Sequence, residues 1–241
     1  MTTCEEESQD VIGFCTDGLA SESRRHLNHD DFEDVGIRMA ERRFGRKDVI
    51  FAPGDPDDQL YFLFEGTVRL YKIYGGYKEA TVALLQDGGV FGELGLEEGG
   101  SQSVFAEAVT EARVAKVRKS AMTEIIRHNP EIATKLLFSF SDRLRQSEEV
   151  VDSLLEREVS ARLATLLANL GHRFGETNGS GTVLNVRLTH QDLANMIVST
   201  REAVSKVMSE FQREGVIEVR DRRIAITPSL ARTSPGATIR T

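Results

Sequence analysis

Three kinds of hydrophobic pattern follow one another along the chain. Short alternating runs of apolar and polar residues, separated by glycines, fill residues 36–118. Apolar residues at gaps of three and four take over at about residue 119, and helical and strand-like patterns mix in the last third. A period of two is typical of strands, and gaps of three and four are typical of helices. The chain is therefore predicted to be an α+β protein whose antiparallel β domain precedes its helices.

The β segment contains the runs LYFLFEGTVRLYKIY, EATVALL and RVAKVRK, with glycine-rich turns between them. Many short strands joined by such turns indicate a sandwich or a barrel. In TVRLYKIY the apolar residues Val68, Leu70 and Ile73 do not alternate perfectly. We therefore expect a bulge in this strand.

The helical segment carries a narrow apolar stripe. Its members recur at alternating gaps of four and three: Ala133, Leu137, Phe140, Leu144, Ser147, Val151 and Leu154. This spacing is typical of the seam between two coiled helices. A helix that packs on its own domain usually shows a wider stripe. We favour a homodimer seam, with packing on the chain's own core as the alternative.

The last third predicts a helix pair followed by a hairpin. After a helix from Ser160 to about Leu170 and a loop over 171–182, Thr189 is expected to cap a helix at about 190–196. A turn around Val198–Ser199 precedes a second helix, which begins near Thr200 and ends before Gly215. VIEVRDRRIAIT, with Asp221 in its turn, forms the hairpin. This arrangement is a winged helix-turn-helix.

The outward face of that unit is predicted to bind double-stranded DNA. Arginine can donate to both acceptors of guanine, glutamate can accept from the cytosine amino group, and wing arginines suit phosphates. A solvated amphipathic helix is the plainer alternative. The predicted contacts are Thr189, Gln191, Ser199, Thr200, Arg201, Glu202, Ser205, Lys206, Arg220, Arg222 and Arg223.

The charge distribution agrees with a basic end on an acidic body. The formal net charge is −8, yet residues 161–241 carry +4 while residues 1–160 carry −12. Such asymmetry favours an anionic partner for the C-terminal part. No run approaches the ~18 apolar residues of a membrane span, and the acidic N-terminus does not resemble a signal peptide. We expect a cytoplasmic location without membrane contact.

The chemical motifs of enzymes and metal sites are missing from the sequence. There is no G-x-S-x-G, H-E-x-x-H, Walker or kinase signature. Cys4 and Cys15 are expected to be reduced thiols, and His26 with His29 to be solvated surface rather than a metal site. We predict a protein that is not an enzyme, with an interaction adaptor as the other non-enzymatic possibility.

Several motifs resemble the catabolite-activator (CRP/FNR) family of bacterial transcription regulators. They are FAPGDPDDQLYFLFEGTVRL, VFGELGL and STREAVSKVMSEFQREGVI, and the likeness extends over roughly residues 40–228. It implies a jelly-roll effector domain, a long dimerising helix, and a two-fold dimer on a pseudo-palindromic operator. The family's recognition pattern falls on Arg201, Glu202 and Lys206, which implies a half-site with a TGTGA-like or GTG core. RNA polymerase is an expected partner, with the loop 171–182 as the place of contact.

The resemblance also implies an effector site. In cyclic-AMP-binding members a Gly-Glu pair holds the ribose and an Arg-Ser pair holds the phosphate. Gly92, Glu93 and Ser103 match that pattern, but Gln102 stands where the arginine would be. A phosphate there would lack a charge-assisted partner. This substitution argues against ordinary cyclic-AMP binding.

The segment from Tyr61 to Leu94 is similar to the nitrogen-control branch of the family, which senses 2-oxoglutarate. That branch implies ligand roles for Arg143 and Glu148, while its barrel arginine falls on Val104. Arg143 could equally be an ion-pair partner of a neighbouring acid. The effector therefore stays open between 2-oxoglutarate, a cyclic nucleotide, a cyclic dinucleotide and none. The expected effector residues are Phe91, Gly92, Glu93, Leu94, Gln102, Ser103, Val104, Arg143, Ser147 and Glu148.

These patterns divide the chain into five parts. They are an arm (1–35), a β-barrel effector domain (36–118), a dimerisation helix region (119–158), a winged helix-turn-helix (159–230) and a tail (231–241).

Overall fold

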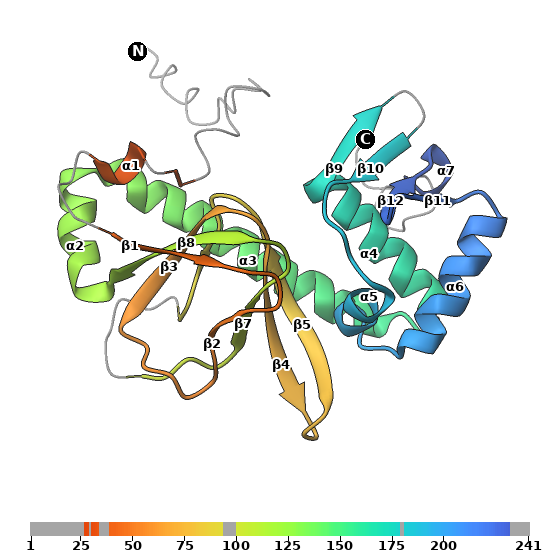
Figure 1. The fold of residues 1–241 in the computed structure, drawn as a ribbon, viewed down its shortest axis with the longest axis horizontal. Coiled ribbons are helices and arrows are strands. Elements are labelled where there is room, and N and C mark those ends of the chain that lie inside the picture. The colour runs from red at the N-terminus through yellow and green to blue at the C-terminus, as the bar shows by residue number, and fades with distance from the viewer. Residues whose placement is uncertain (1–26, 29, 34–38, 94–99, 179–180, 232–241) are drawn as a thin grey trace, which may run out of the picture.

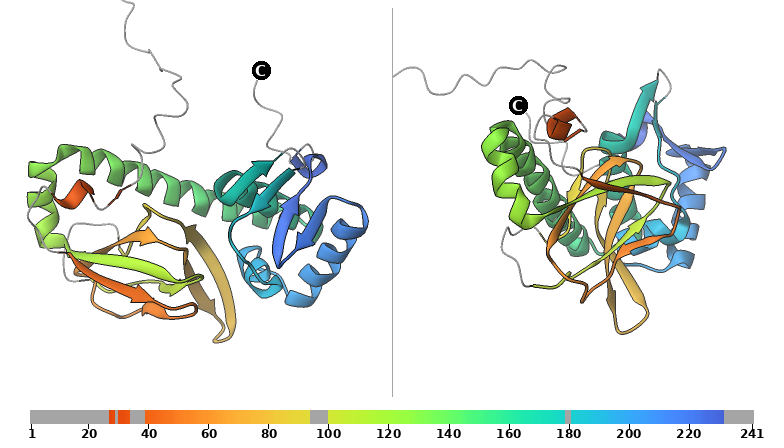
Figure 2. Two further views of the ribbon diagram at one scale, coloured as in Figure 1. Left: turned by 45° about the horizontal axis from the view of Figure 1, so that its top comes forward. Right: turned by 60° about the vertical axis from the view of Figure 1, so that its left-hand side comes forward.

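The structure is a computed structural model, and it describes residues 27–28, 30–33, 39–93, 100–178 and 181–231. A β-rich body lies at one end, and a smaller domain of helices and short strands lies at the other (Figure 1). One long helix runs along the body and leads into the smaller domain (Figure 2). This arrangement confirms the predicted α+β architecture.

The body consists of two four-stranded antiparallel sheets with a shared core. Glycines allow the tight connections between strands, and Gly66 shows why. Its φ is +98°, and a side chain there would lie 2.1 Å from the carbonyl oxygen of Glu111. The first sheet has the order β1 (Ala40–Phe44), β8 (Ala112–Arg118), β3 (Gln59–Glu65) and β6 (Val90–Phe91). The second has the order β2 (Val49–Phe51), β7 (Phe105–Ala108), β4 (Val68–Tyr74) and β5 (Lys78–Leu85).

The bulge predicted for β4 was wrong, because the extra residue lies in its partner strand: between the pairs Leu70–Ala83 and Tyr71–Thr81, Val82 of β5 has no opposite residue, and β4 pairs with β7 without a shift. The pairing of β4 with β5 shifts register between Leu70 and Tyr71. A bulge places two residues of one strand opposite one residue of its partner, and here the bulged strand is β5. Regular alternation along β4 buries Val68 and Leu70 in the barrel core and puts Ile73 on the opposite face, where Ile73 and Tyr74 are exposed at the end of the hairpin.

Two helices follow the barrel, α2 (Lys119–His128) and α3 (Pro130–Leu155). Asn129 caps α3, because its side chain accepts a hydrogen bond from the Glu131 amide, and Pro130 fits the first helical position. The barrel-facing side of α3 buries Ile132 and Leu136. The outer side carries four members of the predicted seam, each at least half exposed: Leu137, Leu144, Val151 and Leu154. For these four residues, packing on the chain's own core is excluded.

The described end of the predicted arm is packed rather than free. Leu27 and Phe32 are 3% and 2% exposed, and the short helix α1 (Asp30–Glu33) lies beside α2. Phe32 meets Phe62 edge to face, and Asp31 pairs with Lys135 at 2.5 Å. Apolar side chains in the polar sequence explain this difference from the expectation. Cys4, Cys15 and His26, with His29, lie outside the described residues.

The C-terminal domain begins with α4 (Val159–Phe174), and here one prediction was wrong. Residues 171–174 continue the helix instead of forming a loop, because Phe174 is buried in the domain core and Gly171 fits closely beneath Ile226. Much of the rest of the expected loop is strand β9 (Gly175–Asn178), and β10 begins at Gly181. The remaining elements are β10 (Gly181–Leu184), α5 (His190–Met196), α6 (Arg201–Arg213), β11 (Ile217–Arg220), β12 (Arg223–Ile226) and α7 (Pro228–Ala231).

The barrel and the C-terminal domain share one apolar cluster. Leu84 and Val109 of the barrel belong to the same group of buried residues as Met196 and Ile197 at the end of α5. The two parts are thus packed against each other as well as joined through α3 and α4. In the described part of the chain, no helix combines the length and apolar character that crossing a membrane requires.

Candidate DNA-binding surface and effector position

The first helix of the C-terminal motif is fixed at its start by a reciprocal cap. The Thr189 hydroxyl accepts from the Asp192 amide at 3.1 Å, and the Asp192 carboxylate accepts from the Thr189 amide at 2.8 Å. Two backbone N–H groups that would otherwise lack partners are satisfied in this way. Thr189 is confirmed as the cap, and α5 spans the residues predicted for the first helix.

The turn between α5 and α6 also falls where the sequence predicted it. Val198 has a φ of +50° and is 43% exposed, and the Ser199 amide donates to the Ala194 carbonyl. Thr200 then caps α6, its hydroxyl accepting from the Ala203 amide at 3.2 Å. Beyond α6, Gly215 adopts a φ of +71°, as expected for the glycine that ends a helix.

Helix α6 buries one face and presents the other to solvent. Val204 and Met208 are buried against α4 and α5. Arg201, Glu202 and Lys206 are exposed. None of these three forms an ion pair with any other residue that the structure describes. An exposed row of unpaired charged groups is what a recognition helix offers to a DNA groove.

Ser205 differs from its neighbours on that face. It was predicted to point outward, but it is half-buried and lies 2.8 Å from the Nδ1 atom of His190. The pair joins the start of α5 to the middle of α6. Ser205 is therefore engaged within the motif and less available to a base than Lys206.

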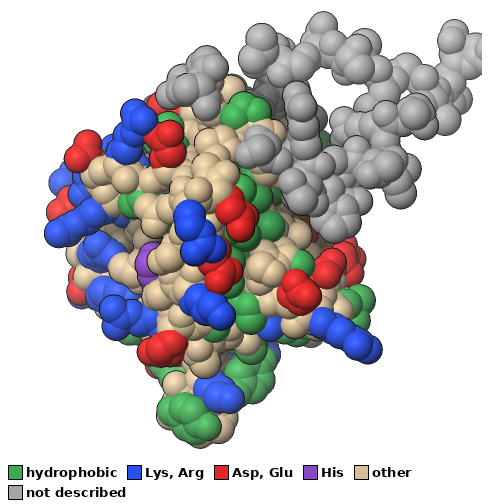
Figure 3. All heavy atoms as spheres, turned by 90° about the vertical axis from the view of Figure 1, so that its right-hand side faces the viewer, with side chains coloured by type: hydrophobic (Ala, Val, Ile, Leu, Met, Phe, Trp, Pro, Cys, Tyr) green, Lys and Arg blue, Asp and Glu red, His purple; other side chains and the backbone are tan. Residues whose placement is uncertain are grey.

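The wing is the hairpin of β11 and β12. Asp221 and Arg222 form its turn with φ values of +51° and +61°. Arg222 and Arg223 are exposed, whereas Arg220 already pairs with Glu218 at 2.6 Å. Figure 3 looks onto this end of the molecule and shows Lys and Arg side chains spread over its surface.

Arg187 is a candidate DNA contact that the sequence analysis missed. It lies between β10 and α5, and it lines a hollow of about 430 Å³ beside the wing together with Arg220 and Arg223. Glu218 and Asp221 line the same hollow and offset part of its positive charge. The only signal in the sequence was one more arginine in the alternating stretch NVRLT.

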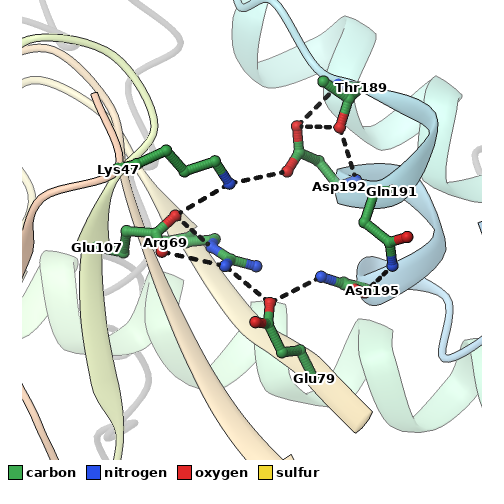
Figure 4. A network of polar contacts seen from close by, with 8 residues as sticks. All are labelled: Lys47, Arg69, Glu79, Glu107, Thr189, Gln191, Asp192 and Asn195. Atoms are coloured by element: carbon green, nitrogen blue, oxygen red, sulfur yellow. Dashed lines mark hydrogen bonds and ion pairs between the residues drawn. The ribbon is translucent and has the colours of Figure 1, made fainter. Parts of the chain in front are cut away.

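Gln191 has neighbours that the sequence did not suggest. Its amide donates to the Asn195 side-chain oxygen at 2.8 Å, and Asn195 in turn donates to Glu79 of strand β5 at 2.9 Å. On the same side, Lys47 lies 3.7 Å from Asp192 (Figure 4). The start of α5 therefore faces the barrel across a polar network.

The expected effector residues converge partly, at the junction of the barrel and α3. The Arg143 guanidinium donates to the Gly92 carbonyl at 2.9 Å, and the Glu93 carboxylate accepts from the Ser103 amide at 3.0 Å. Burial lowers the pKa of Arg143, and the negative charge of Glu93 opposes this shift. Glycine is required at position 92, where φ is +103° and a side chain would lie 3.1 Å from the Gln59 carbonyl.

Gln102 is the least satisfied side chain at this junction. It is 2% exposed, and within the described ranges neither its amide nitrogen nor its amide oxygen has a hydrogen-bond partner. A buried amide without partners costs on the order of 1–3 kcal/mol. Such a group is available to a ligand that brings its own donor and acceptor.

The remaining expected effector residues do not join this group as ligands. Phe91 and Val104 are buried in the barrel core. Ser147 donates to the Arg143 carbonyl and faces solvent, and Glu148 is exposed. The ligand roles expected of Arg143 and Glu148 stay a prediction. Leu94 lies outside the described residues.

Both halves of the chain match known family models. Residues 41–129 match the cyclic nucleotide-binding domain, and residues 161–228 match the Crp-like helix-turn-helix domain. The global nitrogen regulator of Nostoc sp. (strain PCC 7120) is 32% identical over 76% of this chain and 83% of its own length. The chain belongs to the CRP/FNR family of transcription regulators.

Two further relatives, one curated protein and one solved structure, are similar to this chain over most of its length. The CRP-like cAMP-activated global transcriptional regulator of Mycobacterium tuberculosis is 28% identical over 77% of this chain and 83% of its own length. A transcriptional regulator of the CRP family from Thermus thermophilus superimposes with a TM-score of 0.67, at 30% identity, over 79% of this chain and 95% of its own. These relatives are transcription regulators, which are not enzymes.

Proposed function

We propose that this CRP/FNR regulator acts as a homodimer that binds a pseudo-palindromic operator through α6 and the wing. The exposed, unpaired charges of α6 carry this proposal. Arg201 would donate to guanine, Glu202 would accept from cytosine, and Lys206 would reach a base or a phosphate. The wing arginines, together with Arg187, would contact the backbone.

The homodimer is supported by the outer face of α3. Leu137, Leu144, Val151 and Leu154 form an apolar row over five turns of the helix, and each is at least half exposed in the single chain. A second copy of α3 would bury this row and relate the two recognition helices by a two-fold axis. The half-sites of the operator would then be inverted repeats.

A small anionic effector is proposed at the barrel–α3 junction. Arg143 supports this role because it is a half-buried cation that, among the described residues, donates only to a carbonyl and has one carboxylate nearby. It also precedes Leu144 of the apolar row. A ligand that took Arg143 away from the Gly92 carbonyl would therefore act directly on the dimer seam. The candidates are 2-oxoglutarate, a cyclic nucleotide and a cyclic dinucleotide.

A regulator without an effector is the second candidate. The observation that favours it is the Glu93 carboxylate, which already accepts from the Ser103 amide and lies near the Arg143 charge. An internal anion thus occupies donors that an anionic ligand would need. In either case, RNA polymerase is the proposed partner and the cytoplasm the proposed location.

DNA binding is tested by fluorescence anisotropy with a duplex of two inverted TGTGA half-sites. Arg201→Ala should weaken binding by about 1–3 kcal/mol and relax the base preference. Arg213→Ala removes the same charge from the other end of α6 and serves as the control. A duplex with one half-site should bind ~10²-fold or more weakly if both protomers engage together. Equal binding of the Arg201→Ala variant and the wild type would contradict the proposal.

The effector is tested by thermal unfolding with cyclic AMP, 2-oxoglutarate and cyclic di-GMP, one at a time. A ligand at ~100 times its dissociation constant should stabilise the protein by about 2.7 kcal/mol. If one compound raises the midpoint, Arg143→Ala should abolish the shift. If none does, the regulator without an effector is favoured.

A further inference from the structure

A polar network joins the barrel to the start of α5, and it comes from residues far apart in the chain (Figure 4). Lys47 lies between Glu107 at 3.2 Å and Asp192 at 3.7 Å. Glu79 lies between Arg69 at 2.8 Å and Asn195 at 2.9 Å. Two barrel side chains, one basic and one acidic, thus reach the first helix of the DNA-binding motif.

Arg69 holds the barrel side of this network in place. Its side chain is 4% exposed and contacts Glu107 at 3.1 Å as well as Glu79. Burial alone would lower the pKa of Arg69, but the hydrogen bonds and charges of Glu107 and Glu79 outweigh it and raise the pKa above its usual value. The two carboxylates are therefore fixed before α5 meets them, so little side-chain freedom is lost when the two surfaces meet.

Asp192 both caps α5 and contacts the barrel. One oxygen of Asp192 accepts from the Thr189 amide and hydroxyl, while the other faces Lys47. Contact with the barrel therefore needs no change in α5 itself. The motif can dock on the barrel or leave it with its cap intact.

DNA would need the same end of α5. In helix-turn-helix complexes the second helix enters the major groove while the first crosses the phosphate backbone. Here the start of α5 lies against a surface that carries Glu79 and Glu107. Carboxylates repel phosphates, so a DNA strand that crossed α5 on this side would be repelled by the barrel surface.

The packing beside the network is suited to opening. A cavity of about 60 Å³ lies between the barrel and the C-terminal domain, lined among others by Thr81, Leu84, Met196 and Ile197. Thr81 is 4% exposed, and its hydroxyl has no hydrogen-bond partner in the described segments. The cavity shows that the two surfaces are not fully complementary here, and an unsatisfied hydroxyl weakens the closed arrangement further.

We infer that Lys47 and Glu79 form an autoinhibitory latch, which holds α5 on the barrel and must release it before DNA can bind. The inference rests on the proposed DNA-binding function and adds a way to regulate it. An effector, a partner or the DNA itself opens the latch by binding the released state more tightly. The apparent affinity for DNA is then reduced by the fraction of molecules that remain latched.

The test compares barrel variants that leave every proposed DNA contact intact. Lys47→Ala removes a positive charge, so a purely electrostatic effect would weaken DNA binding, whereas release of the latch should tighten it by about three- to tenfold. Lys116→Ala, an exposed lysine on β8, removes the same charge away from the network and should not tighten binding.

Glu79 provides a second, independent comparison. Glu79→Ala and Glu79→Gln remove the same negative charge, but the glutamine still offers an oxygen to Asn195. The latch therefore predicts tighter DNA binding for the alanine variant than for the glutamine variant. Charge alone predicts equal binding. Amide hydrogen exchange of α5 without DNA should be faster in Lys47→Ala and Glu79→Ala than in the wild type.

A reducible cross-link tests the same point in a protein whose fold is retained. Cys4 and Cys15 are replaced by serine, and Glu79→Cys with Asn195→Cys are joined by a short bis-methanethiosulfonate linker. The cross-linked protein should lose binding to the inverted-repeat duplex and regain it on reduction.

The two possible failures are distinguishable. If wild-type protein binds the duplex and Lys47→Ala binds no better than Lys116→Ala, the latch is overturned while the DNA-binding function stands. Unaltered binding of the cross-linked protein has the same meaning. If neither the wild type nor any variant binds DNA, the proposed function fails and the latch fails with it.

Discussion

The arginines of the DNA-binding face and the less exposed arginines of the barrel and α3 are in opposite states. Arg201, Arg222 and Arg223 are exposed and have no ion-pair partner among the described residues. Arg69 is buried and contacts two carboxylates, and Arg143 of α3 donates from its guanidinium to the Gly92 carbonyl. An arginine whose charge is compensated by carboxylates of the chain, as that of Arg69 is, supports the fold. An exposed arginine that has no ion-pair partner among the described residues can bind a phosphate or a base of DNA.

The physical basis of this difference is the cost of desolvation. Taking a charge out of water costs several kcal/mol unless a partner inside the protein compensates it. Exposed arginines stay hydrated and do not incur this desolvation cost in the free protein. When DNA binds, its phosphates and base edges compensate the cost. The comparison therefore predicts that interior substitutions change stability and surface substitutions change binding.

The largest effect is expected at Arg69. Arg69→Ala leaves Glu107, whose side chain is 9% exposed, without its main partner, and should lower the free energy of unfolding by about 3–5 kcal/mol. Arg113→Ala is the control, because Arg113 also contacts two carboxylates but is 26% exposed and should cost no more than about 1 kcal/mol. Urea denaturation measures both. Equal losses would show that burial does not decide the role of an arginine here.

Gln102→Arg puts an unpaired arginine inside the barrel and so tests the comparison from the other side. Without ligand the variant should be less stable, because the glutamine it replaces is 2% exposed. Cyclic AMP would supply the missing anion, and at ~100 times its dissociation constant it should restore about 2.7 kcal/mol. Thermal unfolding with and without cyclic AMP checks this, with Gln102→Lys as a variant of equal charge. Absence of a shift would mean that Gln102 is not what keeps a cyclic phosphate out.

Arg223→Ala should leave the fold unchanged and weaken DNA binding. The free energy of unfolding should stay within about 0.5 kcal/mol of the wild type, while the slope of log affinity against log salt should decrease by about one for each phosphate that is no longer neutralised. Arg220→Ala is the matched variant, and its effect on the slope should be smaller because Glu218 already pairs with Arg220. A loss of stability in Arg223→Ala would place this arginine with the interior group.

The smallest effect concerns the pH dependence of stability. Burial, and secondarily the charge of Asp58, raises the pKa of Tyr61 above 10.0, so the folded protein keeps this phenol neutral longer than the unfolded chain does. The contribution to stability is complete below pH 10 and is lost as the pH rises through the folded pKa. Tyr61→Phe should therefore unfold less readily than the wild type above pH 10, in denaturation series at several pH values. Tyr77→Phe, at a ring that is 78% exposed, should match the wild type.

The C-terminal motif could be predicted in detail because its signals are local. Thr189 and Thr200 cap the two helices, Gly215 ends the second, and Asp221 lies in the wing turn. Each signal acts within a few residues and does not depend on the rest of the fold. The bulge near Leu70 was assigned to the wrong strand, because pairing depends on both strands and the extra residue is Val82 of β5.

Other features depend on distant neighbours and could not be predicted. Helix α4 extends to Phe174 because Phe174 is buried among residues of other elements. The ion pair between Lys47 and Asp192 joins residues that lie in different domains, and no pattern in either segment predicts it. Gln102 was recognised as a departure from the family, but its lack of hydrogen-bond partners within the described ranges was visible only in three dimensions.

The backbone of Val198 has one more consequence. A β-branched residue at positive φ is strained, and such strain persists only where the surroundings leave the chain no alternative. The angle between α5 and α6 is therefore fixed by a rigid turn rather than by a flexible hinge. The two helices should therefore move as one rigid unit, and a small displacement at Asp192 should change the orientation of Arg201.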